Sequence, residues 1–358
     1  MAKIKSITPF FFYFCLHMKR WYLYPFSVVY HTATSVRNGF YNLGLFKSTK
    51  FKTPIINVGN LSVGGSGKSP MVMYLADYLS KYYRTGVLSR GYGRLTKGYG
   101  VTNYDSNYKT VGDEAMQLFQ RFKNRFVITV CEDRVSGARK VISDMDLEVL
   151  LLDDAYQHRA IKPGFNILMT DYNDPYFKDF VLPAGDLRES RSGSGRAQII
   201  MVSKCPNDLT EEKKQYYISR IKPQHNQKVF FSSINYDEEV FSQTKSLPDN
   251  NLAYYDILLI TGIANPKPLL SHLSKFSQKV KHLKFKDHHN FSEQDIKTIL
   301  AEYKKLGEYK LILTTEKDYV RLKTFDLLRD LVYYWPINVR IDRKEEFNQI
   351  IMDYVRKN

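Results

Sequence analysis

The first 76 residues of this chain contain no aspartate or glutamate, and the first acidic residue is Asp77. The same stretch carries nine lysines and arginines, and the whole chain has 53 Lys+Arg against 37 Asp+Glu, a net charge of +16. Because the excess is concentrated at one end, it predicts a surface that attracts an anionic partner. Nucleic acid, anionic lipid and a phosphorylated substrate all fit that description.

Cysteine is scarce, with three residues in a chain of 358. Cys15, Cys131 and Cys205 lie far apart, and no two of them form a C-x-x-C pair. This spacing excludes a disulfide framework and a zinc ribbon, and it favours a reducing compartment.

Long apolar runs are also missing. The apolar segment 7–16 ends before Lys19 and Arg20 and falls well short of the roughly 20 residues that cross a bilayer. No small-residue cleavage site follows it, so it does not fit a signal peptide.

Aromatic residues, by contrast, gather near the N-terminus, with five in succession at 10–14 and more up to Tyr30. Bases stack on aromatic rings, so a nucleic-acid surface is one interpretation. The segment is more apolar than such a surface needs, and an interfacial helix over residues 1–22 that lies on an anionic membrane fits better. A helix that packs these rings on the protein's own core is the alternative.

The segment 62–69 has the sequence Ser-Val-Gly-Gly-Ser-Gly-Lys-Ser and lies between an apolar strand pattern at 54–58 and a helical pattern at 71–79. Strand, glycine-rich turn and helix together are typical of a phosphate-binding P-loop. The predicted phosphate cradle consists of Gly64, Gly65, Ser66, Gly67, Lys68 and Ser69. Lys68 is expected to reach the β- and γ-phosphates of a nucleotide and Ser69 to bind Mg²⁺. Ser62 occupies the position where the generic motif has glycine. A glycine-rich turn with a chance Gly-Lys-Ser is the alternative.

Strand and helix patterns alternate through residue 203, which predicts a mostly parallel sheet with helices on both faces. The expected strands are 85–89, 126–130, 147–152, 165–170 and 199–203, and the expected helices are 115–122 and 134–143. A polar helical pattern at 207–222 and a turn-rich stretch at 236–253 precede another α/β series, with strands near 257–261 and 310–314 and helices near 266–277 and 292–306. We therefore predict two domains, 1–225 and 226–358.

Several polar residues follow predicted strands or open predicted helices. Asp153 and Asp154 end an apolar strand, where an acid either holds Mg²⁺ beside a P-loop or caps a helix. Asp113 opens a helix, and capping is its simplest explanation. Arg188 ends a Pro/Gly loop and is suited to stabilise a transferring phosphoryl group. His288 and His289 point opposite ways on an extended segment, so one histidine paired with a carboxylate is favoured over a shared metal.

Taken together, these motifs resemble the tetraacyldisaccharide 4′-kinase family, the lipid A 4′-kinases of Gram-negative bacteria. The resemblance runs from about residue 24 to residue 318, and residues 1–17 and 325–358 carry no matching motif. The matching segments are 58–70, 88–94, 111–114, 153–158, 183–189, 261–266 and 287–289. Seven motifs in the family's order are far more specific than any one of them, and the Ser62 variant is similar to the family's own.

The resemblance implies an α/β fold of the P-loop NTPase type, a smaller α/β domain that closes over ATP, and an N-terminal membrane-associating helical segment. It implies transfer of the ATP γ-phosphate to the 4′-hydroxyl of tetraacyldisaccharide 1-phosphate, forming lipid IVA at the cytoplasmic face of the bacterial inner membrane. The enzyme would be peripheral or monotopic and would bind no nucleic acid. A nucleic-acid-dependent P-loop ATPase is the alternative function.

The resemblance also implies roles for individual residues. Lys68 and Arg188 would act on the transferred phosphate, and Asp113 would be the base toward the sugar hydroxyl, tuned by His288. Because these last two lie far apart in the sequence, domain closure is expected to bring them together. Mg²⁺ would be held by Ser69 and Asp154, with Glu189 as an outer partner. The expected substrate-binding residues are Arg90, Tyr92, Arg94, Gln157 and His158.

Overall fold

The computed structural model describes residues 20–358, which form two compact units. Unit 1 comprises residues up to 88 together with 134–233 and 340–358, and unit 2 comprises 89–133 and 234–339. The chain therefore passes between the units four times. The predicted division at residue 225 differs from these units in three segments, since 89–133 cluster with unit 2, and 226–233 and 340–358 cluster with unit 1.

Unit 1 is built on a mostly parallel sheet with the strand order β15-β8-β7-β6-β1-β5-β2. The strands are β1 (Ile55–Asn60), β2 (Thr85–Ser89), β5 (Val149–Asp153), β6 (Phe165–Asp171), β7 (Ile199–Ser203), β8 (Lys228–Tyr236) and β15 (Ile337–Ile341). Every residue of β1, β2, β5 and β7 is buried. Strands of this kind need helices on both faces, because neither face can be left in water.

Helices cover both faces of this sheet: α3 (Lys68–Leu79), α6 (Arg134–Met145), α7 (Glu211–Ile221) and α11 (Lys344–Arg356). Successive side chains of β8 point to opposite faces of the sheet and show which helix covers each face. Phe231 contacts Tyr217 of α7, whereas Phe230 contacts Phe347 of α11. The last helix of the chain thereby belongs to unit 1, and the Tyr354 hydroxyl fixes it further by hydrogen bonds to the backbone of Ile55.

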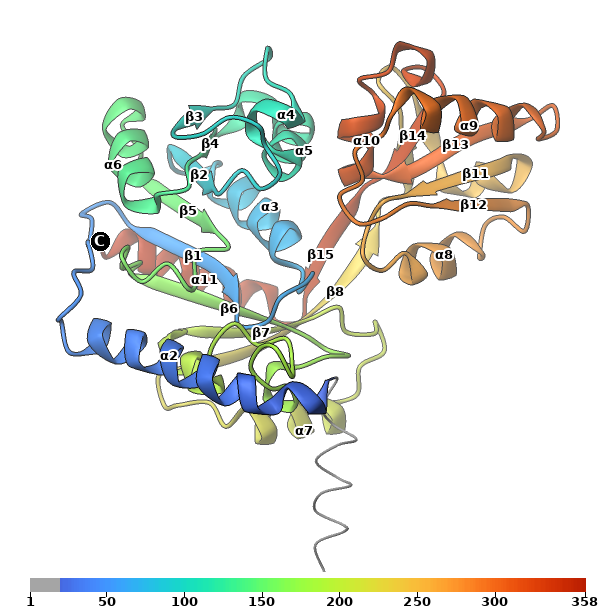
Figure 1. Cartoon of the computed structure of the whole chain (residues 1–358). Helices are drawn as coiled ribbons and strands as arrows, with labels where there is room; N and C mark the ends of the chain where they lie inside the picture. The colour runs from blue at the N-terminus through green and yellow to red at the C-terminus, as the bar shows by residue number, and fades with distance from the viewer. Residues whose placement is uncertain (1–19) are drawn as a thin grey trace, which may run out of the picture. The chain divides into compact units, whose positions relative to one another are not determined.

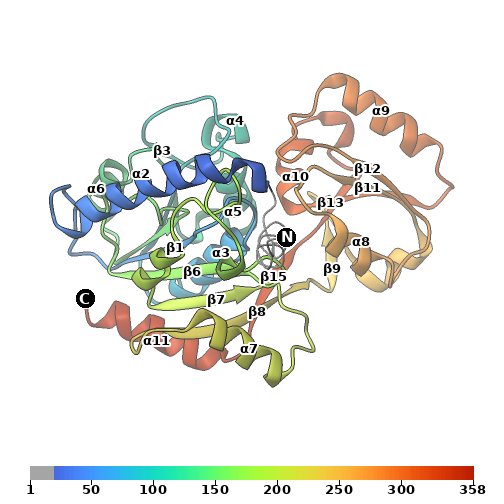
Figure 2. The same cartoon turned by 60° about the horizontal axis from the view of Figure 1, so that its bottom comes forward.

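Unit 2 contains a six-stranded sheet of order β10-β9-β14-β13-β11-β12. These strands are β9 (Glu239–Phe241), β10 (Ser246–Pro248), β11 (Asp256–Thr261), β12 (Val280–Lys284), β13 (Lys310–Thr315) and β14 (Val332–Trp335). Leu258 and Ile260 pack toward α9 (Glu293–Lys304) and α10 (Glu316–Leu322), while Ile257 and Leu259 pack toward α8 (Lys267–Leu273). Figures 1 and 2 show these helices on opposite faces of the sheet.

The remaining elements of unit 2 come from residues 89–133: the short antiparallel pair β3 (Gly100–Val101) and β4 (Val127–Val130), and the helices α4 (Tyr108–Val111) and α5 (Asp113–Phe122). Helix α5 packs beside α10. Its polar contacts there include Gln117, which donates a hydrogen bond to the buried carboxylate of Glu316 at 3.1 Å.

The expected fold class is confirmed: both units are α/β, and the P-loop lies in the larger parallel sheet. The strands expected at 85–89 and 199–203 have the bounds observed for β2 and β7. The helix expected at 266–277 is shorter, because α8 ends at Leu273. Cys131 and Cys205 are buried and form no disulfide bond, and Cys15 lies outside the described residues.

The N-terminal part of unit 1 is helix α2 (Tyr24–Asn42), preceded by a short 3₁₀ turn at Trp21–Leu23. Only Ser27 of this helix is buried. Within residues 20–358, no helix has the length and apolar character needed to cross a membrane. The aromatic run 10–14, on which much of the interfacial-helix prediction rests, lies outside the described residues.

Candidate active site

The predicted P-loop connects β1 to α3. Gly64 and Gly67 have φ of 98° and 78°, a left-handed backbone that side chains with a Cβ rarely adopt. Gly67 is the N-cap of α3, so the helix begins at Lys68 itself. The loop thus presents backbone N–H groups and the positive end of a helix of 12 residues, which together suit an anion.

A second loop, at 183–189, is tied to the start of the P-loop. Val63 N donates to Asp186 O at 2.8 Å, and Arg188 N donates to Leu61 O at 2.7 Å. These backbone bonds pair two segments that lie more than 120 residues apart in the chain, and they bring the Arg188 side chain to the end of β1.

Lys68, Asp154 and Arg188 meet there in one charged cluster. The Arg188 guanidinium binds both oxygens of Asp154, at 2.7 and 3.2 Å, and Lys68 Nζ lies 3.7 Å from the same carboxylate. Burial acts to raise the pKa of Asp154, but the charges of Lys68 and Arg188 outweigh it and hold that pKa below its usual value. Asp154 is therefore a carboxylate at neutral pH.

Asn60 completes this cluster, although no sequence motif predicted a role for it. Its side-chain oxygen accepts from Lys68 Nζ at 3.2 Å and from Arg188. It is the last residue of β1, a buried polar side chain at the carboxyl end of an apolar strand. That position was the signal that could have marked it, since ligands of open α/β sheets bind at strand carboxyl ends.

Glu189 is fully engaged by protein groups. Its carboxylate is 1% exposed and accepts from Arg196 at 2.8 Å, from Gln157 at 3.0 Å and from Asn38 at 2.8 Å. Gln157 also donates to Asn60 O at 2.9 Å, so it links Glu189 to the phosphate-side cluster. Glu189 is thus connected to the phosphate-side cluster through Gln157.

The donor set fits Mg²⁺. Asp154 is an ionised carboxylate and is partly exposed, and Ser69 supplies a hydroxyl from the first turn of α3. Mg²⁺ prefers oxygen ligands of this kind and keeps several waters, so one carboxylate and one hydroxyl beside a phosphate cradle suffice.

Asp113 lies in unit 2, as the first residue of α5. Gly112 before it has φ of 88°, and a Cβ there would approach Tyr92 O to 2.9 Å, so only glycine allows the two loops to come this close. Asp113 Oδ2 lies 2.9 Å from His288 Nδ1 and 3.6 Å from an Arg321 nitrogen. Its other oxygen, Oδ1, is buried and has no hydrogen-bond partner within the described chain.

The surroundings of Asp113 keep it ionised. Burial of the carboxylate, which is 6% exposed, acts to raise its pKa. The hydrogen bond from His288 and the positive charge of Lys317, with smaller contributions from His288 and Arg321, reverse this and lower the pKa. A buried, ionised carboxylate with one unpaired oxygen is suited to accept a proton.

The expectation that domain closure must join Asp113 to His288 was wrong, because both residues belong to unit 2 and are already in contact. Helix α5 packs on α10 within that unit, and His288 lies on the loop after β12. His289 instead contacts Asp295 at 3.0 Å, so the two neighbouring histidines have different partners, as their sequence spacing predicted.

The predicted substrate-binding residues have differing environments. Arg90 is exposed, and Tyr92 is exposed with its ring against that of His288, 5.3 Å between centroids. The Arg94 side chain is buried and binds Glu132 at 2.6 Å, so it holds its own loop. In unit 1, Gln157 and His158 follow the end of β5 and are half-buried.

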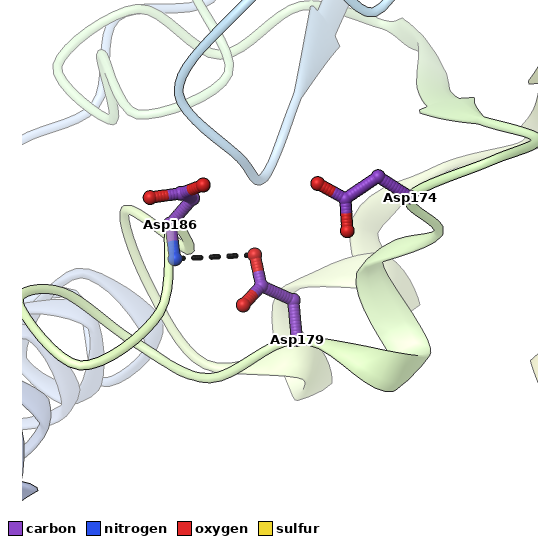
Figure 3. A group of neighbouring side chains, drawn as sticks. All are labelled: Asp174, Asp179 and Asp186. Atoms are coloured by element: carbon purple, nitrogen blue, oxygen red, sulfur yellow. Dashed lines mark hydrogen bonds between the residues drawn. The ribbon is translucent and has the colours of Figure 1, made fainter. Parts of the chain in front are cut away.

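An acidic group of Asp174, Asp179 and Asp186 lies beside the 183–189 loop (Figure 3). Asp179 accepts hydrogen bonds from the backbone N–H groups of Phe180 and Asp186, at 2.8 and 3.1 Å, and Asp186 pairs with Arg20. These contacts shape the loop that carries Arg188, which accounts for the group structurally.

A P-loop, an ionised acid at the adjacent strand end and an arginine over both, set in a parallel α/β sheet, define a nucleotide-binding protein of the P-loop phosphotransferase class. The model of the family described as tetraacyldisaccharide-1-P 4′-kinase matches residues 19–356. The chain belongs to this family, and it is a kinase.

Individual relatives support the same family assignment. A tetraacyldisaccharide 4′-kinase of Flavobacterium johnsoniae is 42% identical over 345 residues, covering 96% of this chain and 99% of the relative. One from Bacteroides thetaiotaomicron is 40% identical over 362 residues, covering 96% and 95%. The crystal structure of an "apo" form of LpxK from Aquifex aeolicus in complex with ATP has a TM-score of 0.75 and 28% identity, over 93% of this chain and 98% of that one. These findings support the kinase and not the nucleic-acid-dependent ATPase.

Proposed function

We propose that this protein transfers the γ-phosphate of ATP to the 4′-hydroxyl of tetraacyldisaccharide 1-phosphate and so forms lipid IVA. The observation that carries the proposal is the cluster of Lys68, Asp154 and Arg188 at the start of α3 in a chain of this family. A cradle of backbone N–H groups with two cations over it is what a transferring phosphoryl group requires.

In this proposal Lys68 and the amides of Gly64 to Gly67 hold the β- and γ-phosphates. Ser69 and Asp154 hold Mg²⁺, which would screen the phosphate charge when bound. Arg188 leaves its paired position on Asp154, where it has only partial access to solvent, and offsets charge on the transferred group. Glu189 supports these groups through Gln157, because its own oxygens are already occupied.

Asp113 is the proposed base. Its unpaired buried oxygen Oδ1 accepts the proton of the sugar hydroxyl as the new oxygen–phosphorus bond forms, while Oδ2 stays on His288. Arg90 and Tyr92, both exposed beside the Asp113 segment, contact the phosphorylated disaccharide, as do Gln157 and His158. Arg94 contributes by fixing the loop through Glu132.

The lipid substrate suggests a membrane surface, and α2 supports one. Its exposed apolar side chains include Phe26 at 64%, Val29 at 69%, Val36 and Phe40. Their spacings of three, seven and four residues place them on one face of the helix. An exposed apolar stripe on a helix in a basic segment is typical of a helix that lies in the membrane interface.

Polar side chains of α2 bond to the rest of unit 1, along which the helix runs in Figures 1 and 2. Ala184 N donates to Ser27 Oγ at 2.8 Å, Tyr30 donates to Arg188 O at 3.0 Å, and Asn38 donates to Glu189 at 2.8 Å. The helix thus binds the protein through polar groups and turns its apolar side chains outward. We propose that this face seats the enzyme on the cytoplasmic side of the bacterial inner membrane, peripherally or monotopically, without a nucleic-acid partner.

The membrane proposal is tested by sedimentation with vesicles of anionic phospholipid. Replacing Phe26 and Phe40 together by serine should lower the bound fraction several-fold, because each buried apolar side chain contributes about 1.5–3 kcal/mol. Leu327→Ser, which removes an exposed apolar side chain from unit 2, is the matched control and should bind as wild type does. Unchanged sedimentation of the double variant would contradict the proposal.

The kinase proposal is tested by incubating the purified protein with γ-³²P-labelled ATP and tetraacyldisaccharide 1-phosphate. Label should enter a lipid-extractable product, and its release by a 4′-phosphatase should leave the starting lipid. Nucleic acid should not stimulate turnover of ATP. Stimulated hydrolysis with no labelled lipid would favour the alternative ATPase.

A further inference from the structure

The imidazole of His288 is held by side chains from three separate segments of unit 2. Its Nδ1 lies 2.9 Å from Asp113 Oδ2 on α5, and its Nε2 lies 2.8 Å from Lys317 Nζ on α10. The ring of Tyr92 meets it edge-on, with 5.3 Å between centroids. The backbone of His288 is itself constrained: its φ is 56°, and its N–H donates to Gly262 O at 3.0 Å.

The hydrogen-bonding groups around His288 determine which ring nitrogen carries the proton. A lysine ammonium has three donor hydrogens and no acceptor, so His288 Nε2 must accept from Lys317 and cannot carry a hydrogen. A neutral imidazole without hydrogen on Nε2 carries it on Nδ1, which then donates to the Asp113 carboxylate. A doubly protonated ring would set an N–H against the ammonium, so this contact favours the neutral ring.

We propose that Lys317 is a positioning residue that holds His288 as the neutral Nδ1–H tautomer and through it fixes the Asp113 carboxylate. This inference rests on the proposed role of Asp113 as base, and it extends that role to a residue that touches neither substrate. It also narrows the role of His288, which orients Asp113 and does not take up the proton's charge as imidazolium.

Neighbouring contacts hold the backbone of Lys317 in a position from which its side chain reaches His288. The next residue on α10, Asp318, accepts from Gly262 N at 2.8 Å and pairs with Arg321 at 2.9 Å. Arg321 also donates to His289 O at 2.8 Å and lies 3.6 Å from Asp113. Helix α10 therefore contacts the Gly262 loop, the backbone of His289 and the first turn of α5. We call Asp113, His288 and Lys317 the relay, and these contacts hold its three side chains in place relative to one another.

The relay serves the proton transfer. The O–H bond of the sugar breaks, its proton passes to Asp113 Oδ1, and the sugar oxygen binds the γ-phosphorus. The bond between the γ-phosphorus and the bridging β–γ oxygen breaks at the same time, and ADP leaves with the electron pair of that bond. A hydrogen bond from His288 to Oδ2 fixes the carboxylate rotation that aims Oδ1. With the proton on the wrong ring nitrogen, two lone pairs would face each other and the carboxylate would turn away.

The test reads the tautomer directly. Full-length protein labelled with ¹⁵N-histidine is studied by long-range ¹H–¹⁵N correlation of the imidazole rings, with the His288 signal assigned by its loss in His288→Gln. The wild type should show a protonated Nδ1 and an acceptor Nε2. Lys317→Met, of similar length but without a donor, should shift His288 to the other tautomer or to imidazolium, and Lys317→Arg, which keeps a donor, should retain the wild-type pattern.

The same variants are also assayed for kcat and for the KM of ATP. Lys317→Met should lower kcat roughly 10- to 100-fold, the range typical of groups that orient a reacting side chain, while KM for ATP stays within about twofold. Lys317→Arg should recover most of the loss. Lys297→Met, which removes an exposed lysine from α9 of the same unit, is the control and should leave both the spectrum and kcat unchanged.

Three results would overturn the proposal: a wild-type His288 protonated at Nε2, an unchanged tautomer in Lys317→Met, or a changed tautomer with unchanged kcat. The first of these results is measured on the wild-type protein, so the proposal can be refuted even if a variant fails to fold. Failure of the underlying base assignment is seen separately, as an Asp113→Asn variant with full activity.

Discussion

The pairing of Asp113 with His288 makes a quantitative prediction. Asp113→Ala removes the base, and general bases contribute about 10²- to 10⁴-fold to rate, or roughly 3–5 kcal/mol. His288→Ala removes a hydrogen bond of 2.9 Å to a carboxylate that is 6% exposed. Such charge-assisted bonds are worth about 1.5–3 kcal/mol, so kcat should fall by about 10- to 150-fold.

The double variant is the decisive measurement. Because His288 acts through Asp113, the double variant should be within about threefold of Asp113→Ala, and the coupling energy should equal nearly the whole His288 effect, about 1.5–3 kcal/mol. The assay is labelled-phosphate transfer to tetraacyldisaccharide 1-phosphate at saturating ATP, with KM for ATP measured alongside and folding checked by thermal melting.

His289→Ala is the matched control, since His289 contacts Asp295 at 3.0 Å and not Asp113. It should leave kcat close to wild type. Multiplicative losses in the Asp113–His288 cycle, with a coupling below about 0.5 kcal/mol, would refute the reasoning, and capping of α5 would then be the better explanation of Asp113.

Three further predictions concern the phosphate side. Lys68→Ala should lower the rate about 10³-fold, because it removes a cation from the β- and γ-phosphates, and near wild-type turnover of the folded variant would contradict the P-loop assignment. Asp154→Asn should raise the Mg²⁺ concentration needed for half-maximal rate far more than Asp153→Asn; the reverse order in Mg²⁺ titrations would move the metal to Asp153. Arg188→Lys keeps the charge but loses the fork that binds both oxygens of Asp154, so kcat should fall at least tenfold, and full activity would show that charge alone suffices.

Local sequence patterns determined much of this protein. The strand–glycine turn–helix context located the P-loop, the apolar strand ending in two acids located Asp154, and β2 and β7 have the predicted bounds. These features are local: a buried strand, a left-handed glycine and a helix start each depend on residues within a few positions, so they can be recognised without knowledge of the fold.

Other features required the tertiary structure. Residues 344–356 form a helix of unit 1 although they follow unit 2 in the chain, because Phe347 packs on Phe230 of β8. Asn60 and Glu189 acquired their roles from partners up to about 150 residues away. The relay of Asp113, His288 and Lys317 draws on three segments that only the packing of α5 against α10 brings together. No periodicity encodes such a meeting, since it depends on how whole elements pack, and that is decided by the long-range burial of apolar surface rather than by any short stretch of chain.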